Sequence, residues 1–124
     1  MLLDKCVFCE IIKGNSPCTK IYEDQHVLAF LDINPVSENH TLIMPKNHYV
    51  NLYDIPENEL KHLLVATKRI TLQFQNDHDV QGVNVLHASG AEAQQSVYHF
   101  HLHLVPRRIG DGLDHFLLPK GITT

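Results

Sequence analysis

Residues 96–106 read SVYHFHLHLVP and form the most informative segment of the chain. Three histidines alternate there with three apolar side chains, in the order His99, Phe100, His101, Leu102, His103 and Leu104. A strict period of two is typical of a β-strand, because successive side chains of a strand point to opposite faces of the sheet. We therefore predict that the whole segment is a strand, with the imidazoles on one face and the apolar side chains against the core.

Histidine is frequent in this chain, with 10 residues against 3 cysteines. A single histidine on a strand face is usually no more than a solvated polar residue, which is the alternative interpretation of the pattern. Three in strict alternation are improbable by chance, and imidazole is suited to nucleophilic, acid–base and metal-binding chemistry near neutral pH. The pattern therefore favours a functional face.

The length of 124 residues corresponds to one domain, which we expect over residues 1–124 with a core at about 6–107 and a tail at 108–124. The formal charge of −4 gives no indication of nucleic-acid or membrane binding. Charged residues come too early for a secretory signal peptide, and no apolar run approaches the length of a membrane span. These features predict a cytoplasmic protein.

Two of the three cysteines form the motif Cys6-x-x-Cys9. Cysteines in the cytosol seldom serve as a disulfide framework, so this motif is a candidate metal or redox pair. Cys18 has no evident partner in the sequence and is expected to be an ordinary thiol.

The periodicity of the chain predicts five strands and two helices. The strands are expected at 21–23, 27–33, 40–44, 82–89 and 96–106, and the helices at 6–14 and 56–75. Asp54-x-x-Glu57 predicts a capping box at the start of the second helix. Its apolar stripe should face the core or a dimer partner and consists of Leu60, Leu63, Leu64, Thr67, Ile70 and Phe74. Because strands and helices do not alternate regularly, we expect an α+β fold with an antiparallel sheet.

Several motifs together resemble the histidine triad (HIT) superfamily, in particular its Hint-like bacterial branch. QSV at 95–97 followed by HFHLHLVPR at 99–107 is similar to the family signature His-φ-His-φ-His-φ-φ. Residues 21–24, residues 30–35 and the motif PKNH at 45–48 also resemble the family, in the expected order. The resemblance implies a HIT-like fold of five antiparallel strands and two helices. It also implies a homodimer in which two sheets join into a continuous ten-stranded sheet.

The resemblance further implies a nucleotide-binding hydrolase or transferase, most simply a purine nucleoside phosphoramidase. His101, the middle histidine, would attack the α-phosphorus and form a covalent nucleotidyl intermediate. His103 would donate hydrogen bonds or assist proton transfer near the leaving group. Ser96 and the backbone N–H groups of 94–97 would hold the phosphate. Arg107 and Arg108 could attract the anion or could simply be solvated.

The same resemblance implies a nucleoside site in which Asp32 accepts hydrogen bonds from the ribose and apolar side chains enclose the base. The full set implied for nucleotide binding is Phe8, Ile11, Phe30, Asp32, Ile33, Ser89, Gln95, Ser96, Val97, His101 and His103. Taken singly, the apolar members would be assigned to the core.

Zinc-containing members of the family resemble this chain in a ligand set of two cysteines and two histidines, here Cys6, Cys9, His48 and His99. Such a set is a closed tetrahedral site, so the resemblance implies structural Zn²⁺. A catalytic metal held by the three triad histidines is a weaker alternative, because alternate side chains on a straight strand are about 6.6 Å apart.

Two positions depart from the family pattern. Ala88 occupies a position where many Hint-like members have an amide side chain, and Ser89 is a candidate to compensate. Asn39 stands where Gly is common, a substitution that left-handed backbone conformations tolerate. Two further functions stay open: hydrolysis of dinucleoside polyphosphates, and a nucleotide- and zinc-binding module with little turnover.

Overall fold

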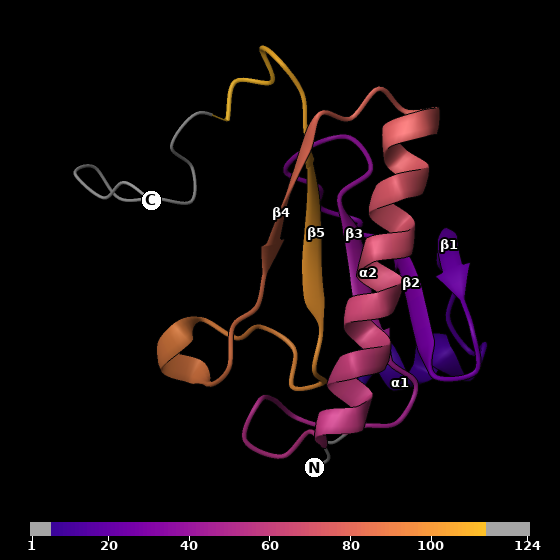
Figure 1. Ribbon diagram of the computed structural model, residues 1–124. Helices are drawn as coiled ribbons and strands as arrows, with labels where there is room; N and C mark the ends of the chain where they lie inside the picture. Colours follow the sequence, from indigo (N-terminus) through magenta and orange to yellow (C-terminus); the bar gives the residue numbers. More distant parts are fainter. Residues whose placement is uncertain (1–5, 114–124) are drawn as a thin grey trace.

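The computed structural model describes residues 6–113, which form one antiparallel sheet with a helix on each face (Figure 1). The elements in chain order are α1 (Val7–Ile12), β1 (Lys20–Glu23), β2 (Val27–Leu31), β3 (Thr41–Pro45), α2 (Glu57–Asp77), β4 (Gly82–Leu86), a 3₁₀ turn η1 (Ala91–Ala93) and β5 (Leu102–Arg107). The strand order is β1-β2-β3-β5-β4. The predicted α+β class is therefore confirmed. Residues 114–124 of the predicted tail lie outside the described residues.

Helix α2 packs across one face of the sheet (Figure 1). Its buried side chains meet alternate residues of the strands in one apolar core, which includes Val27, Ala29, Ile43, Leu63, Ala66, Ile70, Phe74, Phe100 and Leu104. Four members of the predicted stripe are buried, whereas Leu64 is 64% exposed. The helix therefore turns Leu64 away from this core. Among residues 6–113, no helix is both long and apolar enough to cross a membrane.

The opposite face of the sheet carries α1 and a smaller apolar cluster. That cluster consists of Phe8, Leu28, Phe30, Leu42 and Met44. Strand β2 thus buries side chains on both faces, since Val27 and Ala29 face α2 while Leu28 and Phe30 face α1. A space remains beside this smaller cluster, and the histidines border it.

The histidine segment follows the predicted alternation but is not a strand throughout. Phe100 and Leu104 are buried in the α2 core, whereas the rings of His99 and His101 contact Phe8 on the α1 side. Strand β5 begins only at Leu102, so the prediction of a strand over 96–106 is wrong at its start. The reason is the hydrogen-bond partner. The N–H of Phe100 donates to the carbonyl of Tyr49, in the loop after β3, at 2.6 Å.

The predicted capping box is also wrong. The N-cap residue of α2 is Pro56, and no side-chain cap is found there. The Asp54 carboxylate instead accepts hydrogen bonds from the backbone N–H groups of Val50 and Asn51, at 2.9–3.0 Å. Asp54 therefore orders the loop before the helix and not the first turn of the helix.

Candidate active site and metal centre

Four sulfur and nitrogen ligand atoms meet where α1 approaches the segments after β3 and before β5. They belong to Cys6, Cys9, His48 and His99, and all four lie within 4.8 Å of one another. The Cys6 sulfur lies 3.4 Å from His99 Nδ1, and the Cys9 sulfur lies 3.3 Å from His48 Nδ1. Cys6 is also the N-cap of α1 and accepts the backbone N–H of Cys9. The start of the helix therefore sets the spacing of the two thiols.

The four residues fit a zinc ion in spacing and in protonation. Sulfur and nitrogen ligands of tetrahedral Zn²⁺ are about 3.5 Å apart, given Zn–S of about 2.3 Å and Zn–N of about 2.0 Å. His99 Nε2 donates to the carbonyl of Pro45 at 2.9 Å, which leaves the lone pair of Nδ1 directed at the thiols. Burial lowers the pKa of His99 to about 4, so its imidazole is neutral at pH 7. Burial raises the pKa of the Cys9 thiol to about 11, which a bound cation would reverse.

A cavity of about 340 Å³ lies between α1, the start of the 32–34 loop and the histidine segment. Eight of the eleven residues predicted to contact a nucleotide line it: Phe8, Phe30, Asp32, Ile33, Ser96, Val97, His101 and His103. Val7, Asn34 and Leu42 complete the lining. Its lining combines apolar side chains with imidazole, hydroxyl and carboxylate groups, which is typical of a site for a small ligand.

The imidazole of His101 has a defined tautomer. Its Nδ1 donates to the carbonyl of His99 at 2.7 Å, so Nε2 carries the free lone pair. Burial lowers its pKa, which keeps the ring neutral at pH 7. The edge of Phe8 packs against this ring with the centroids 5.1 Å apart. A neutral, held imidazole at a cavity wall is a competent nucleophile.

His103 is held by His40, a residue that the sequence analysis did not identify. The backbone N–H of Val36 donates to His40 Nδ1, which places the His40 proton on Nε2. That nitrogen lies 3.0 Å from His103 Nδ1 and 3.5 Å from the Asp32 carboxylate. His103 therefore accepts at Nδ1 and carries its own proton on Nε2. Burial lowers the pKa of His103 to about 4, so the ring is neutral.

The other three predicted nucleotide residues lie elsewhere in the described structure. Ile11 packs against the smaller apolar cluster. The Gln95 amide accepts from Gly90 and donates to the carbonyls of Val50 and Val97, so it braces the loop that carries Ser96. The Ser89 hydroxyl accepts the N–H of Leu52 at 2.9 Å. Ser89 is thus engaged in the scaffold.

The geometry also goes against a metal held by all three triad histidines. Among the described residues, His99 groups with the two thiols, His103 groups with Asp32 and His40, and His101 belongs to neither group. Arg107, the last residue of β5, and Arg108 are held by nearby groups as well. Arg107 pairs with Asp111 at 2.8 Å, and Arg108 donates to the carbonyl of Glu38.

A family model supports the assignment that this geometry indicates. The model of the HIT domain matches residues 13–110, which is most of the chain. The chain belongs to the HIT family. The fold is the one expected from the sequence motifs.

Individual HIT proteins are similar over most of this chain. Protein hit of Bacillus subtilis is 43% identical over 110 residues, covering 88% of this chain and 76% of that protein. An adenosine 5'-monophosphoramidase of Candida albicans is 41% identical over 107 residues, covering 83% of this chain and 70% of that protein. The structure of a Zn-bound histidine triad family protein from Mycobacterium smegmatis has a TM-score of 0.83 and 41% identity, covering 87% of this chain and 78% of that one.

Proposed function

We propose that this HIT protein hydrolyses or transfers purine nucleoside monophosphates from phosphoramidate substrates, with His101 as the nucleophile. The observation that carries the proposal is the hydrogen bond from His101 Nδ1 to the carbonyl of His99. It leaves Nε2 with a lone pair on a side chain that lines the 340 Å³ cavity. The Candida relative, named an adenosine 5'-monophosphoramidase, supports the same substrate class.

The reaction proceeds as two displacements at phosphorus. His101 Nε2 attacks the α-phosphorus, the P–N bond to the substrate amine breaks, and the amine leaves with the bonding pair and takes up a proton from solvent. Water then attacks the phosphorus, the bond to His101 breaks, and the nucleoside monophosphate is released. His103 Nε2–H and the Ser96 hydroxyl donate hydrogen bonds to the phosphate or the leaving nitrogen, where charge develops.

Asp32 and the apolar side chains of the cavity lining bind the nucleoside. One carboxylate oxygen of Asp32 accepts the backbone N–H of Asn34 at 2.9 Å, which fixes the carboxylate at the cavity rim. The ribose hydroxyls donate to it. Phe8 and Phe30 form an edge-to-face pair with centroids 5.7 Å apart, and Ile33, which lines the same cavity, is 91% exposed. Ile33 therefore offers a free apolar surface to a purine ring.

Zinc, when bound by Cys6, Cys9, His48 and His99, would supply a structural cross-link and no chemistry at the substrate. The ligands tie α1 to the segment before β5 and so hold Phe8 against His101. The Zn-bound Mycobacterium relative supports the binding of zinc. All three cysteines are free thiols in the structure, which suits the cytoplasmic location that we propose.

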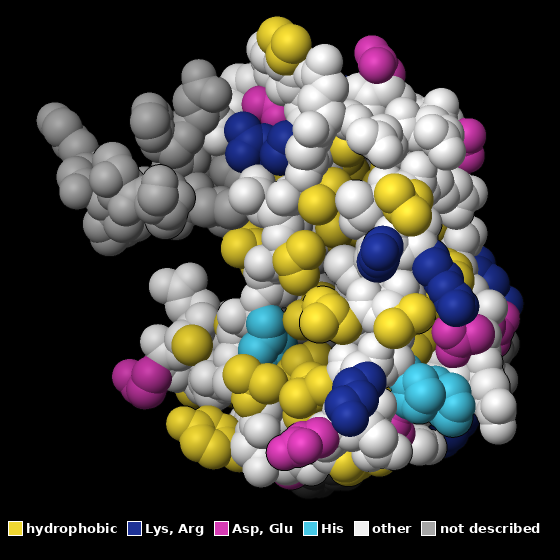
Figure 2. All heavy atoms as spheres, viewed as in Figure 1, with side chains coloured by type: hydrophobic (Ala, Val, Ile, Leu, Met, Phe, Trp, Pro, Cys, Tyr) yellow, Lys and Arg dark blue, Asp and Glu magenta, His cyan; other side chains and the backbone are white. Residues whose placement is uncertain are grey.

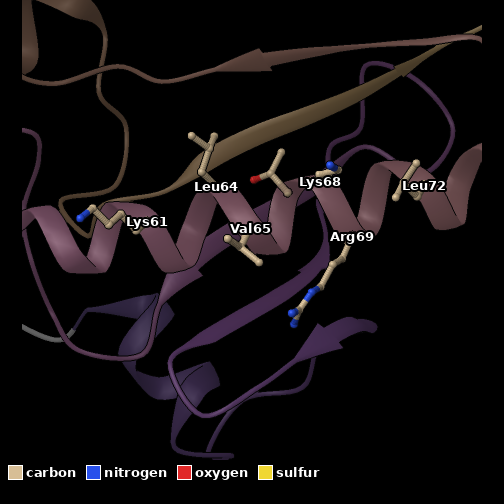
Figure 3. Close-up of a pocket in the computed structure, with 7 residues that line it drawn as sticks. Lys61, Leu64, Val65, Lys68, Arg69 and Leu72 are labelled. Atoms are coloured by element: carbon tan, nitrogen blue, oxygen red, sulfur yellow. The ribbon is translucent and has the colours of Figure 1, made fainter.

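We further propose that the protein acts as a homodimer through the outer face of α2 and the edge strand β4. Leu64, Val65 and Leu72 are 50–64% exposed and line a groove of about 650 Å³ (Figure 3). Figure 2 shows apolar side chains gathered on this face of the molecule among basic ones. Strand β4 is one edge of the described sheet, and a second copy that pairs with it would continue the sheet. Light scattering tests this. Leu64→Glu should yield a monomer, whereas Tyr53→Glu, at an exposed residue outside the groove, should not.

The test of the function is the intact mass of the protein after brief incubation with adenosine phosphoramidate and an alkaline quench. The alkaline quench is needed because a phosphohistidine bond is labile to acid. The parent protein should gain one adenylyl group, and His101→Ala should gain none. If the parent protein forms no adduct and shows no turnover but still binds adenosine monophosphate, the protein is a nucleotide-binding module and not an enzyme.

A further inference from the structure

His87, a histidine outside the triad, contacts the backbone of His101 and is not among the residues that line the cavity. Strand β4 ends at Leu86, whose partner in β5 is His103. One residue later, the ring of His87 stacks on Phe100 with centroids 4.2 Å apart and planes at 23°. Its Nδ1 lies 2.9 Å from the carbonyl oxygen of His101. A carbonyl can only accept, so His87 Nδ1 carries the proton. A side chain thus donates to the main chain of His101 just past the last pair of the β4–β5 ladder.

The other nitrogen of His87 continues the connection to a distant loop. Because Nδ1 is protonated in the neutral ring, Nε2 has a lone pair and accepts from the hydroxyl of Ser89. The Ser89 oxygen in turn accepts the backbone N–H of Leu52 at 2.9 Å. Each group is either a donor or an acceptor in each bond without conflict. A series of hydrogen bonds therefore runs from the loop before α2 through Ser89 and His87 to His101.

This series of hydrogen bonds helps to set the direction of the lone pair on His101 Nε2. The His101 ring is held through Nδ1 by the carbonyl of His99, within the same short run of backbone that His87 holds at the His101 carbonyl. That run is not paired as a strand, because β5 begins at Leu102. A side-chain donor therefore replaces the ladder bonds that would otherwise fix these peptide planes. A misplacement of about 1 Å at a reacting group costs about 100-fold in rate.

We propose that His87 is a positioning residue that holds the backbone of His101 so that its Nε2 faces the phosphorus. Within residues 6–113, His87 is not part of the cavity lining, and both of its ring nitrogens have partners. It acts through His101 and does not touch the substrate. The proposal rests on the proposed function, in which His101 is the nucleophile.

The test compares three variants in the full-length protein. His87→Phe keeps a ring over Phe100 but removes both nitrogens. His87→Asn places an amide N–H near the position of Nδ1 and restores only the bond to His101. Ser89→Ala removes only the outer link. With adenosine phosphoramidate, His87→Phe should lower kcat about 10- to 100-fold with KM within about twofold. His87→Asn should recover most of that loss, and Ser89→Ala should lower kcat by only about threefold.

A second measurement does not depend on turnover. Nitrogen-15 NMR of the imidazoles reports the tautomer of His101, which should be Nδ1–H in the parent protein and a mixture in His87→Phe. An unchanged kcat and an unchanged His101 tautomer in His87→Phe would overturn the proposal. Equal losses in the Phe and Asn variants, together with a lowered melting temperature, would also overturn it, since they indicate a purely structural role. If the parent protein shows no adduct, the proposed function fails, and the tautomer alone decides whether His87 positions His101.

Discussion

The two faces of the sheet differ in what they bury. On the α2 face, a continuous apolar core joins the long helix to β2, β3 and β5, and Phe74, Ile70 and Leu63 are at most 1% exposed. On the α1 face, a six-residue helix covers a small cluster and leaves a cavity bordered by histidines. The difference teaches that the α2 face supplies most of the buried core, whereas the α1 face holds the cavity in which we propose the chemistry. Phe100 and His101 are neighbours in sequence, yet one fills the core and the other lines the cavity.

The largest expected effect of any single change is on activity at the α1 face. His101→Ala should lower kcat at least about 1,000-fold, because the attacking nitrogen is lost. The melting temperature should change little, since the ring packs beside a cavity and not within the α2 core. Steady-state kinetics and calorimetry on the same samples measure both quantities. Turnover of His101→Ala near the parent rate would contradict the covalent mechanism.

The matching change on the α2 face should affect stability instead. Phe74 is 1% exposed, so Phe74→Ala should lower the free energy of unfolding by about 3–5 kcal/mol. Gln73→Ala is the control on the same helix, because Gln73 is exposed and lies outside the groove proposed for the dimer, so its loss should cost about 0.5 kcal/mol or less. Urea unfolding measures both. A kcat loss in folded Phe74→Ala as large as that of His101→Ala would contradict the division between faces.

Loss of a zinc ligand should weaken the α1 face. Cys6→Ser should bind less than one zinc per chain and melt about 5 °C or more below the parent, since the cross-link between α1 and the segment before β5 is lost. Cys18→Ser, at an exposed thiol, should match the parent in both measurements. Elemental analysis with thermal unfolding tests this. Full zinc content in Cys6→Ser would show that Cys6 is not a zinc ligand and would favour a redox or inert pair of cysteines.

Asp32→Asn should sharpen the distinction within the cavity between nucleoside binding and chemistry. The Kd for adenosine monophosphate should rise about tenfold, because a neutral amide oxygen is a weaker acceptor for ribose hydroxyls than a carboxylate. Isothermal titration calorimetry measures the change, with adenine as a control ligand that lacks ribose. If the binding of adenine is weakened equally, Asp32 maintains the shape of the cavity and does not bind the ribose.

The α1 face should also give stability a dependence on pH, to a smaller extent. The pKa of His103 is 6.5 when unfolded and about 4 when folded, because burial disfavours its charged form. The unfolded chain therefore binds more protons in this window. The contribution of His103 is fully present above pH 6.5 and is lost as the pH falls toward 4. The loss of unfolding free energy between about pH 7 and about pH 5 should be smaller in His103→Asn than in the parent. Equal losses would contradict the depressed pKa.

Local pattern was enough to predict the division between faces. Side chains of an extended chain alternate whether or not the backbone is paired, so the placement of Phe100 and His101 on opposite faces followed from their order alone. The number of strands and helices followed in the same way from periodicity. The cysteine pair and the histidine motifs indicated the ligand set through the family resemblance, and the structure brings those four residues together.

The hydrogen-bond partners of the histidines were decided only by the tertiary structure. His40 lies 63 positions before His103, and Leu52 lies 37 positions before Ser89, so no local period could relate them. The same holds for the late start of β5, where Phe100 bonds to the loop after β3. Alternation is a property of one extended segment, whereas a hydrogen bond needs a partner that the folded chain brings near. The sequence by itself thus determined which face each triad side chain occupies, and only the tertiary structure decided which groups hold it there.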